Sequence, residues 1–405
     1  MSNKNQEYKK TEIGKLPSEW EIKSIGDIGE IITGSTPKIT YDFIDKVQHL
    51  WVSPADMGNT KYIRDTAKKL NNSSFNKTRI LPKGSILVTC IGSTIGKIGI
   101  AGDELSTNQQ INSIVCSEKY NNEYIYYVID YNFNNYMRFI SSQAVPIINK
   151  TTFSKFKIQI PRREEQEKIA EILSTWDSAI EKQEQLIEKK KEFKKGLMQR
   201  LLSGKVRFKE FNDEWVSTKI NHYIKPVIRE CEKPTDAYWR LGLRSHGKGT
   251  FHELVEDPAS VSMDKLYIVK NNDLIVNITF AWEHAIAVAD KNDEGKLVSH
   301  RFPTYEFNEN AYPKFFKYYI LQSKFKHILV NISPGGAGRN RVMNKKDFLN
   351  ISVKIPSYEE QAKIAEVLSA ADKEIELLEK ELEALKLQKK GLMQRLLTGE
   401  VRVKV

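Results

Sequence analysis

The sequence predicts a mixed α/β fold of the α+β type, in which two globular domains alternate with two long helices in a tandem repeat. The stretch that begins at Ile160, IPRREEQEKIAEIL, returns at Ile355 as IPSYEEQAKIAEVL, and the ends KKGLMQRLLSGKVR and KKGLMQRLLTGEVR also match. Equivalent residues, such as Pro161 and Pro356, lie 195 positions apart (356 minus 161) with no gap. The chain is therefore a duplication, and the two copies should fold alike.

Each copy of the repeat carries the signals of a long helix. Pro161 and Pro356 precede the copies, a pair of glutamates follows each proline, and glycines stand past the ends at Gly204 and Gly399. Proline and acidic residues favour a helix N-terminus, and glycine favours a helix end. The pattern predicts two helices of about 40 residues, each roughly 60 Å long at about 1.5 Å per residue.

The apolar residues of both helices recur in alternating steps of three and four, which is the heptad spacing of a coiled coil. Polar Gln183, Lys190 and Lys194 interrupt the first copy. We expect the seam to be buried against the other copy; two unrelated amphipathic helices on separate domains are the alternative. The apolar seam positions are Ile169, Leu173, Trp176, Ile180, Ile187, Leu197, Ile364, Leu368, Ile375, Leu378, Leu382, Leu385 and Leu392.

Composition and charge restrict the class of protein. The chain has 405 residues, of which 40% are hydrophobic, so it has room for two or three domains with filled cores. A formal net charge of +11 indicates an anionic partner, nucleic acid before a membrane surface. Residues 1–20 lack the apolar core of a signal peptide, and the three cysteines are scattered. We expect a cytoplasmic protein with neither a disulfide framework nor a membrane partner.

The duplication extends beyond the helices. Trp20 and Trp215 each follow a glutamate and are 195 residues apart (215 minus 20). The C-terminal stretch from Gly399 resembles the stretch from Gly204, which leads into the second unit. We therefore expect the N-terminal unit to follow the C-terminal stretch in space, as in a ring with two-fold pseudo-symmetry.

The regions between the helices have diverged. A β-branched stretch at 83–89 predicts a strand, and its match at 271–277 comes 188 residues later (271 minus 83), so loops were inserted or deleted. Short helices are predicted from Asn122 to Tyr136 and from Pro313 to Val330. We divide the chain into an N-terminal globular domain (1–160), a central helical spacer (161–208), a second globular domain (209–355) and a C-terminal helical spacer (356–405).

Catalytic motifs are not supported. The loop from Gly92 to Ile98 resembles a phosphate-binding loop, but Walker spacing would need glycine at Ile91 and serine or threonine at Ile98. No dinucleotide-binding glycine motif follows a strand, and no Asn-Pro-Pro-aromatic stretch of a base-flipping methyltransferase occurs. Asp177 and Glu188 fall on the heptad helix, and the seven histidines never have metal-site spacing. The sequence predicts a chain that binds and does not catalyse, with no cofactor or metal of its own.

Several loops have the composition of a DNA-reading surface. Asn and Gln side chains can pair with adenine and Arg with guanine, while Lys, Ser and Thr hold phosphates. An ordinary polar turn is the alternative for each loop, and the glycine-rich stretch that ends at Arg341 is the strongest single prediction. The candidates are Thr36, Lys38, Ser93, Thr94, Lys97, Asn108, Gln109, Gln110, Gln143, Arg240, Arg244, His246, Lys248, Trp282, His300, Arg301, Arg339, Asn340 and Arg341.

Over essentially its whole length the chain resembles the specificity (S) subunit of type I restriction-modification systems. The most specific marks are the two IP-x-x-EEQ-x-KIAE openings and the two KKGLMQRLL-[ST]-G-x-VR closings. Weaker marks are the loops Gly34–Pro37 and Thr107–Gln110, and the Lys-x-x-Phe patterns that begin at Lys150 and Lys345.

The resemblance implies that the globular domains are target recognition domains, each reading one half of an asymmetric, bipartite site in double-stranded DNA. It implies that the helices pair antiparallel, set the gap between the half-sites and dock two methyltransferase (M) subunits, which carry S-adenosylmethionine and methylate adenine. Restriction (R) subunits, which use ATP and Mg²⁺, would join for ATP-dependent cleavage. An M subunit is one candidate partner for the polar seam positions Gln183, Lys190 and Lys194.

Two other functions were weighed for this chain. One is a stand-alone DNA methyltransferase or nuclease, which the missing cofactor and metal motifs disfavour. The other is a coiled-coil scaffold whose variable domains bind proteins. A DNA reader differs from a protein scaffold in losing affinity steeply as the salt concentration rises.

Overall fold

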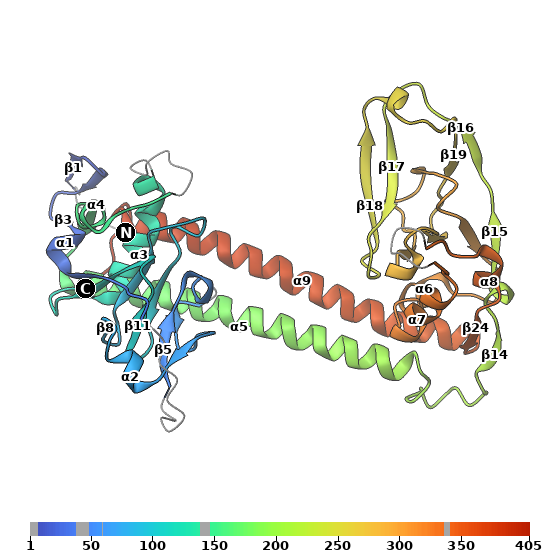
Figure 1. Ribbon diagram of the computed structural model, residues 1–405, viewed down its shortest axis with the longest axis horizontal. Helices are drawn as coiled ribbons and strands as arrows, with labels where there is room; N and C mark the ends of the chain where they lie inside the picture. Colours follow the sequence, from blue (N-terminus) through green and yellow to red (C-terminus); the bar gives the residue numbers. More distant parts are fainter. Residues whose placement is uncertain (1–6, 38–47, 59, 138–145, 336–340) are drawn as a thin grey trace. The chain divides into compact units, whose positions relative to one another are not determined.

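A computed structural model describes residues 7–37, 48–58, 60–137, 146–335 and 341–405. The chain forms two compact units, one of Met1–Glu184 with Glu381–Val405 (unit 1) and one of Gln185–Lys380 (unit 2). Each unit contains about half of α5 (Arg163–Leu201) and half of α9 (Tyr358–Leu397), the two long helices drawn in green and red in Figure 1. Within the described ranges, no helix has the length and apolar character that crossing a membrane requires.

Unit 1 is built on two sheets. The first has the order β4-β12-β9-β10-β6, and the second has the order β7-β5-β11-β8. The helix α3 (Asn122–Tyr136) packs against the first sheet, and its apolar residues share a core with β9 and with the start of α5. The strands are β4 (Gly29–Thr33), β12 (Ile111–Cys116), β9 (Ile86–Thr89), β10 (Ile98–Ala101), β6 (Tyr62–Ile63), β7 (Lys69–Leu70), β5 (His49–Val52), β11 (Leu105–Thr107) and β8 (Ile80–Leu81).

Shorter elements of unit 1 complete the domain. The strand β3 pairs antiparallel with β13, so the start of the domain lies beside the strand that leads into α5. A hairpin of β1 and β2 precedes it. These elements are β1 (Tyr8–Thr11), β2 (Gly14–Pro17), β3 (Glu21–Ser24), α1 (Ile25–Ile28), η1 (Pro54–Asp56), α2 (Asn72–Phe75), α4 (Lys150–Ser154) and β13 (Lys157–Ile160).

Unit 2 repeats this plan with changed contents. Its sheets have the orders β15-β23-β20-β21 and β16-β19-β22-β17-β18. Its core joins β20, α6 and the start of α9, as the core of unit 1 joins β9, α3 and the start of α5. The strands are β15 (Ile224–Val227), β23 (Thr304–Phe307), β20 (Leu274–Val276), β21 (Ile286–Val288), β16 (Glu230–Glu232), β19 (Lys265–Ile268), β22 (Leu297–Val298), β17 (Tyr238–Leu243) and β18 (Thr250–Val255).

The remaining elements of unit 2 frame it like those of unit 1. The strand β14 pairs antiparallel with β24, which leads into α9. The elements are β14 (Val216–Lys219), η3 (Ile220–His222), η4 (Pro258–Ser260), η5 (Ala281–Glu283), α6 (Pro313–Tyr319), α7 (Ser323–Asn331), α8 (Lys345–Leu349) and β24 (Ser352–Ile355). The predicted mixed α/β fold with a tandem repeat is thus confirmed, whereas the four-part division at residues 160, 208 and 355 stays a prediction.

The predicted short helices had different outcomes. The helix predicted from Asn122 to Tyr136 is α3. The single helix predicted from Pro313 to Val330 is wrong, because the segment forms two helices, α6 and α7. Between them Gln322 is extended (φ −62°, ψ 141°), and the carbonyl of Ile320 bonds Nε2 of His284 at 2.7 Å. A side chain from another element thus satisfies a carbonyl at the break.

The repeated glutamates do more than favour a helix N-terminus. Glu165 is 2% exposed, and its carboxylate accepts hydrogen bonds from Nε1 of Trp20 at 3.2 Å and from Nε and Nη2 of Arg402 at 2.5 and 2.8 Å. We call these three residues the clasp of unit 1. A buried carboxylate is stable only when it is paired and hydrogen-bonded, and the clasp meets both conditions.

Unit 2 has the same clasp at the positions 195 residues away. Glu360 is 1% exposed and accepts hydrogen bonds from Nε1 of Trp215 at 3.2 Å and from Nε and Nη2 of Arg207 at 2.9 and 2.7 Å. In unit 2 the arginine comes from the stretch after α5, and in unit 1 it comes from the C-terminal stretch after α9. The C-terminal stretch therefore leads into unit 1 as the central stretch leads into unit 2, which agrees with the predicted ring.

The long helices contact each other in antiparallel order inside each unit. In unit 1, Asp177 pairs with Lys389, and Glu184 pairs with Lys386 at 2.9 Å. Along the whole of α5 and α9, both fully described, each of the predicted apolar seam positions is buried or half-buried. The two unrelated helices that were the alternative are therefore excluded.

The polar seam positions find partners within the chain. Lys190 pairs with Glu374 at 2.5 Å and Lys194 pairs with Asp372, while Nε2 of Gln183 donates to Glu381 at 3.1 Å. An M subunit is therefore not needed to explain them, and that expectation was wrong. The heptad pattern alone could not identify these partners, because they are polar residues on α9.

Candidate nucleic-acid interface

The same three connections meet in both units. In unit 1, the backbone N–H of Cys90 donates to the carbonyl of Gln110 at 2.8 Å, and Ile148 N–H donates to the carbonyl of Cys90 at 2.8 Å. In unit 2, Ile278 takes the place of Cys90, 188 residues later. Its N–H donates to Arg301 at 3.0 Å, and its carbonyl accepts from Met343 at 2.8 Å. Loops far apart in sequence are thereby held together at one end of each sheet.

In unit 1 the surface around this junction is rich in hydroxyl and amide groups. The loop at Gly34 lies against the loop at Thr107, with Ser35 N–H donating to the Thr107 carbonyl at 2.8 Å and Thr36 donating from its hydroxyl to Gln109. A Cβ at Gly34 would lie 2.1 Å from the carbonyl oxygen of Asn108, so this close approach requires glycine. The sequence-predicted residues Thr36, Gln109 and Gln110 are thus brought together.

Not every candidate in unit 1 presents a free polar edge. Asn108 is 8% exposed and its amide donates to Gln110 at 2.9 Å, so it supports the loop from inside. Nζ of Lys97 is held by the carbonyl of Pro54 at 3.1 Å. Ser93 is exposed and Thr94 half-buried on the turn after β9. Lys38 and Gln143 lie outside the described residues.

In unit 2 the corresponding surface is basic and aromatic. His246 N–H donates to the carbonyl of Glu283 at 2.7 Å, which brings the loop after β17 to η5. The Arg341 guanidinium lies over the ring of Trp282 at 5.4 Å, and Arg301 reaches the hydroxyl of Thr279 at 3.4 Å. Guanidinium and aromatic groups are the types that contact phosphates, bases and exposed rings of nucleic acid.

The other candidates of unit 2 fall into three groups. Arg244, Lys248 and His300 are exposed on this loop system. Arg240 is on β17 and forms an ion pair with Glu253 at 2.7 Å, so it is already engaged. Arg339 and Asn340 lie outside the described residues. The assignment of individual residues to DNA contact stays a prediction.

Sequence reasoning missed Thr279 and Phe280, which lie next to Trp282 on this surface; Phe280 is 41% exposed. The signal was available, because the 188-residue shift that aligns β9 with β20 also aligns Phe280 with Gly92. In unit 1 that position follows the strand and belongs to a predicted DNA-reading loop. A position-by-position comparison of the two units would have found both residues.

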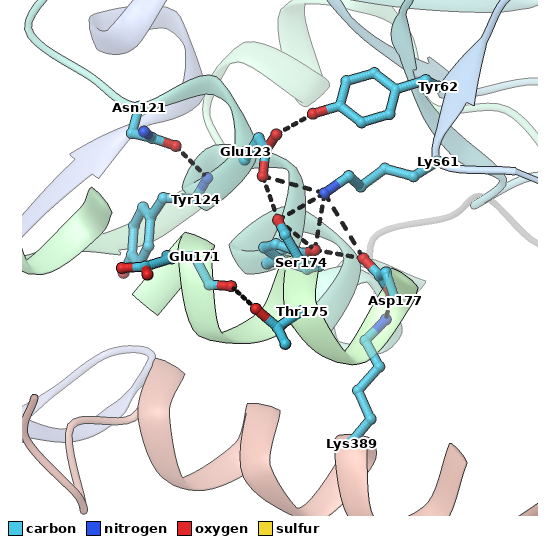
Figure 2. A network of polar contacts seen from close by, with 11 residues as sticks. Lys61, Tyr62, Asn121, Glu123, Tyr124, Glu171, Ser174, Thr175, Asp177 and Lys389 are labelled. Carbon is cyan, nitrogen blue, oxygen red and sulfur yellow. Dashed lines mark hydrogen bonds and ion pairs between the residues drawn. The ribbon is translucent and has the colours of Figure 1, made fainter. Parts of the chain in front are cut away.

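A buried polar network fixes the recognition domain of unit 1 onto the helices. Figure 2 shows Lys61 reaching Glu123 on α3 and Ser174 and Asp177 on α5, with Nζ distances of 3.1, 2.8 and 3.8 Å. Tyr62 and Ser174 both donate to Glu123. Burial alone would raise the pKa of Glu123, but these hydrogen bonds and the charge of Lys61 outweigh it and lower the pKa.

Unit 2 attaches its domain with the equivalent helix residues. The hydroxyl of Tyr318 on α6 donates to Asp372 at 2.6 Å and lies 3.2 Å from Ser369. Ser369 and Asp372 are the repeats of Ser174 and Asp177, and Lys194 is the repeat of Lys389. A Tyr hydroxyl and the same Ser, Asp and Lys set therefore hold each loop surface at a fixed place on its helices.

The fold and these two surfaces define a class of protein, a duplicated recognition protein that holds two unlike loop surfaces on paired helices. The part of the chain that the structure describes has no cluster of His, Cys, Asp and Glu able to hold a metal ion. Residues 17–189 and 223–387 match the family described as the type I restriction modification DNA specificity domain. The chain belongs to this family and is a DNA-specificity subunit of a type I restriction system.

Relatives span the whole chain. The MjaVIII specificity subunit of Methanocaldococcus jannaschii is 26% identical, with 99% of this chain and 97% of the relative covered. The MjaIX specificity subunit of the same organism is 36% identical over 45% of this chain and 44% of its own. Among solved structures, the S subunit from M. genitalium has a TM-score of 0.53 at 15% identity, covering 93% of this chain and 96% of that one. The last similarity concerns the fold.

Proposed function

We propose that each unit of this specificity subunit reads one half of an asymmetric, bipartite site in double-stranded DNA. The observation that carries the proposal is that one backbone junction presents different side chains in the two units. Amide and hydroxyl groups of Thr36, Gln109 and Gln110 surround it in unit 1, and Arg301 and Arg341 surround it in unit 2. Different donors and acceptors select different bases, so the half-sites differ.

The two long helices carry the shared functions of the complex. They are the part that the two units have in common, whereas the recognition domains have diverged. A partner that fits both units must use common residues, so two M subunits dock on the helices, one for each unit. The M subunits supply S-adenosylmethionine and methylate adenine, and R subunits bring ATP-dependent cleavage. Continuous helices also fix the gap between the half-sites. The complex acts on DNA in the cytoplasm.

Domain exchange tests this function. Residues 215–355 are replaced by the equivalent region of a related subunit, the chain is expressed with its M subunit, and genomic methylation is mapped. One half of the methylated motif should change, while the other half and the gap stay as before. The matched control replaces residues 20–160 and should change the opposite half. A change in both halves after either exchange would refute independent reading.

Salt titration separates DNA reading from a protein scaffold. Binding of the complex to a duplex with the mapped motif is measured as the salt concentration rises from about 50 to about 200 mM. A DNA reader releases counterions from phosphates and should lose about 10³-fold or more in affinity over this range. Binding that hardly changes with salt would favour the protein-scaffold alternative.

A further inference from the structure

The helix pair of unit 2 exposes large apolar side chains. Leu186 is 38% exposed, Phe193 is 62% exposed and Leu377 is 54% exposed. They lie beside the seam, whose predicted apolar positions are all buried or half-buried in the two fully described helices. Each of these three side chains leaves apolar surface in water that a partner would cover favourably.

The three side chains lie on one flank of the helix pair. Lys190 is four residues after Leu186 and three before Phe193, and residues three or four apart share a helix face. Nζ of Lys190 pairs with Glu374 at 2.5 Å, and Glu374 is three residues before Leu377 on α9. The ion pair therefore has apolar neighbours on both helices. We call Leu186, Phe193 and Leu377 the flank patch.

The repeat gives unit 1 a polar surface at the same positions. The counterparts 195 residues away are Glu381 for Leu186, Gln388 for Phe193 and Lys182 for Leu377. All three counterparts are exposed, and Glu381 accepts a hydrogen bond from Gln183 across the helix pair. The two units thus share their attachment networks and clasps, but only the flank of unit 2 is apolar at these positions.

We propose that the flank patch is part of the docking surface for an M subunit and makes unit 2 the tighter of the two M sites. The complex then assembles in order, with one M subunit on unit 2 before the second binds unit 1. This inference rests on the proposed function, in which M subunits dock on the helices. DNA is a poor occupant because the patch is apolar and its central ion pair leaves no excess positive charge.

The proposal predicts unequal affinities for two copies of one partner. Apolar side chains that fill pockets of a partner dominate binding energies, and a tenfold change in affinity needs only about 1.4 kcal/mol. We expect the two M subunits to bind with dissociation constants that differ about tenfold or more. The 1:1 complex should therefore dominate when M is limiting, as native mass spectrometry of the full chain titrated with M would show.

Paired substitutions identify the tighter site. Phe193→Ser with Leu377→Ser should weaken the tighter constant about tenfold and leave the weaker one unchanged. The matched control, Gln388→Ser with Lys182→Ser, should change neither constant. In the reverse variant, Lys182→Leu, Glu381→Leu and Gln388→Phe should tighten the weaker site toward the stronger one. The reverse variant keeps the proposal testable if the first one folds poorly.

Several results would overturn the inference. Two equal M constants in the native chain, or a tighter constant that the Phe193 and Leu377 substitutions leave unchanged, would do so. Self-association of the chain that the same substitutions abolish without affecting M binding would assign the patch to a second copy. These results leave the proposed function intact, whereas failure of M to bind the chain at all would contradict the proposed function itself.

Discussion

The two clasps show how single residues join segments that are distant in sequence. Glu165 and Glu360 are almost fully buried, and each depends on an arginine that comes from the stretch after the other long helix. Removing one partner of a buried ion pair leaves an unpaired charge, which costs more than the pair itself contributes. The clasps should therefore control whether each unit stays closed.

Arg402→Ala should destabilise unit 1 by about 3 kcal/mol, because it leaves the Glu165 carboxylate buried without its charge partner. Urea unfolding followed by hydrogen exchange in α3 measures the loss. Adding Glu165→Gln should recover more than half of it, since a neutral amide is less costly to bury. Arg207→Ala is the matched variant and should affect unit 2 instead. An equal effect of Arg402→Ala on both units would contradict the assignment.

His284 gives unit 2 a dependence on pH. It is 4% exposed and its Nε2 bonds the carbonyl of Ile320. Burial lowers its pKa below the ordinary value of 6.5, and Lys326 and His246 lower it further. Below about pH 6.5 the unfolded chain takes up a proton that the folded chain does not, so the stability of unit 2 falls as the pH falls.

Replacing His284 should remove this dependence. His284 has a left-handed backbone (φ 67°), which asparagine tolerates better than most residues, so His284→Asn is the suitable change. The variant should be less stable at pH 8 and should lose less additional stability between pH 7 and 5 than the native chain. Thermal unfolding at a series of pH values measures both. An unchanged pH slope would show that other groups cause it.

At the scale of elements, the long helices pair through polar as well as apolar contacts. The polar positions stand in the seam itself, and each has a partner on the opposite helix. A seam made only of leucine and isoleucine would be tighter but would allow shifted registers, whereas a polar pair favours one alignment. We expect these pairs to contribute more to register than to stability.

A double-mutant cycle on Lys194 and Asp372 tests the contribution to stability. Lys194→Met and Asp372→Asn should each destabilise unit 2, and the double variant should be more stable than the sum predicts by about 1 kcal/mol. The coupling should shrink in high salt, because Lys194 is partly exposed. Chemical unfolding of the four chains gives the coupling energy, and additive effects would mean that the pair does not interact in solution.

The helices and their pairing could be predicted from the sequence because they depend on local spacing and on the repeat itself. The strand β9 and the helix α3 could be predicted for the same reason. The break between α6 and α7 could not, since the bond from His284 to Ile320 comes from 36 residues away. For the candidate site, loop composition identified Gln109 and Arg301, but only the fold shows that Asn108 faces inward.

At the scale of the whole molecule, the two recognition surfaces should contribute differently to DNA binding. The candidates around the junction of unit 1 that remain accessible carry hydroxyl and amide groups, whereas Arg244, Lys248 and Arg301 of unit 2 carry positive charge. Contacts from neutral groups read bases without releasing counterions, and contacts from cations to phosphates release them. Most of the salt dependence contributed by these loops should therefore come from unit 2.

Matched variants separate these contributions. In the complex with M subunits, Arg301→Gln and Lys248→Gln should each reduce the slope of log affinity against log salt by about 0.9 if the side chain contacts a phosphate. Gln109→Ala should lower affinity for the cognate duplex without changing the slope, because an amide carries no charge. Fluorescence anisotropy between about 50 and 200 mM salt measures both quantities. An unchanged slope in both unit 2 variants would remove the basic loops from the DNA contact and move the counterion release to other cations of the complex.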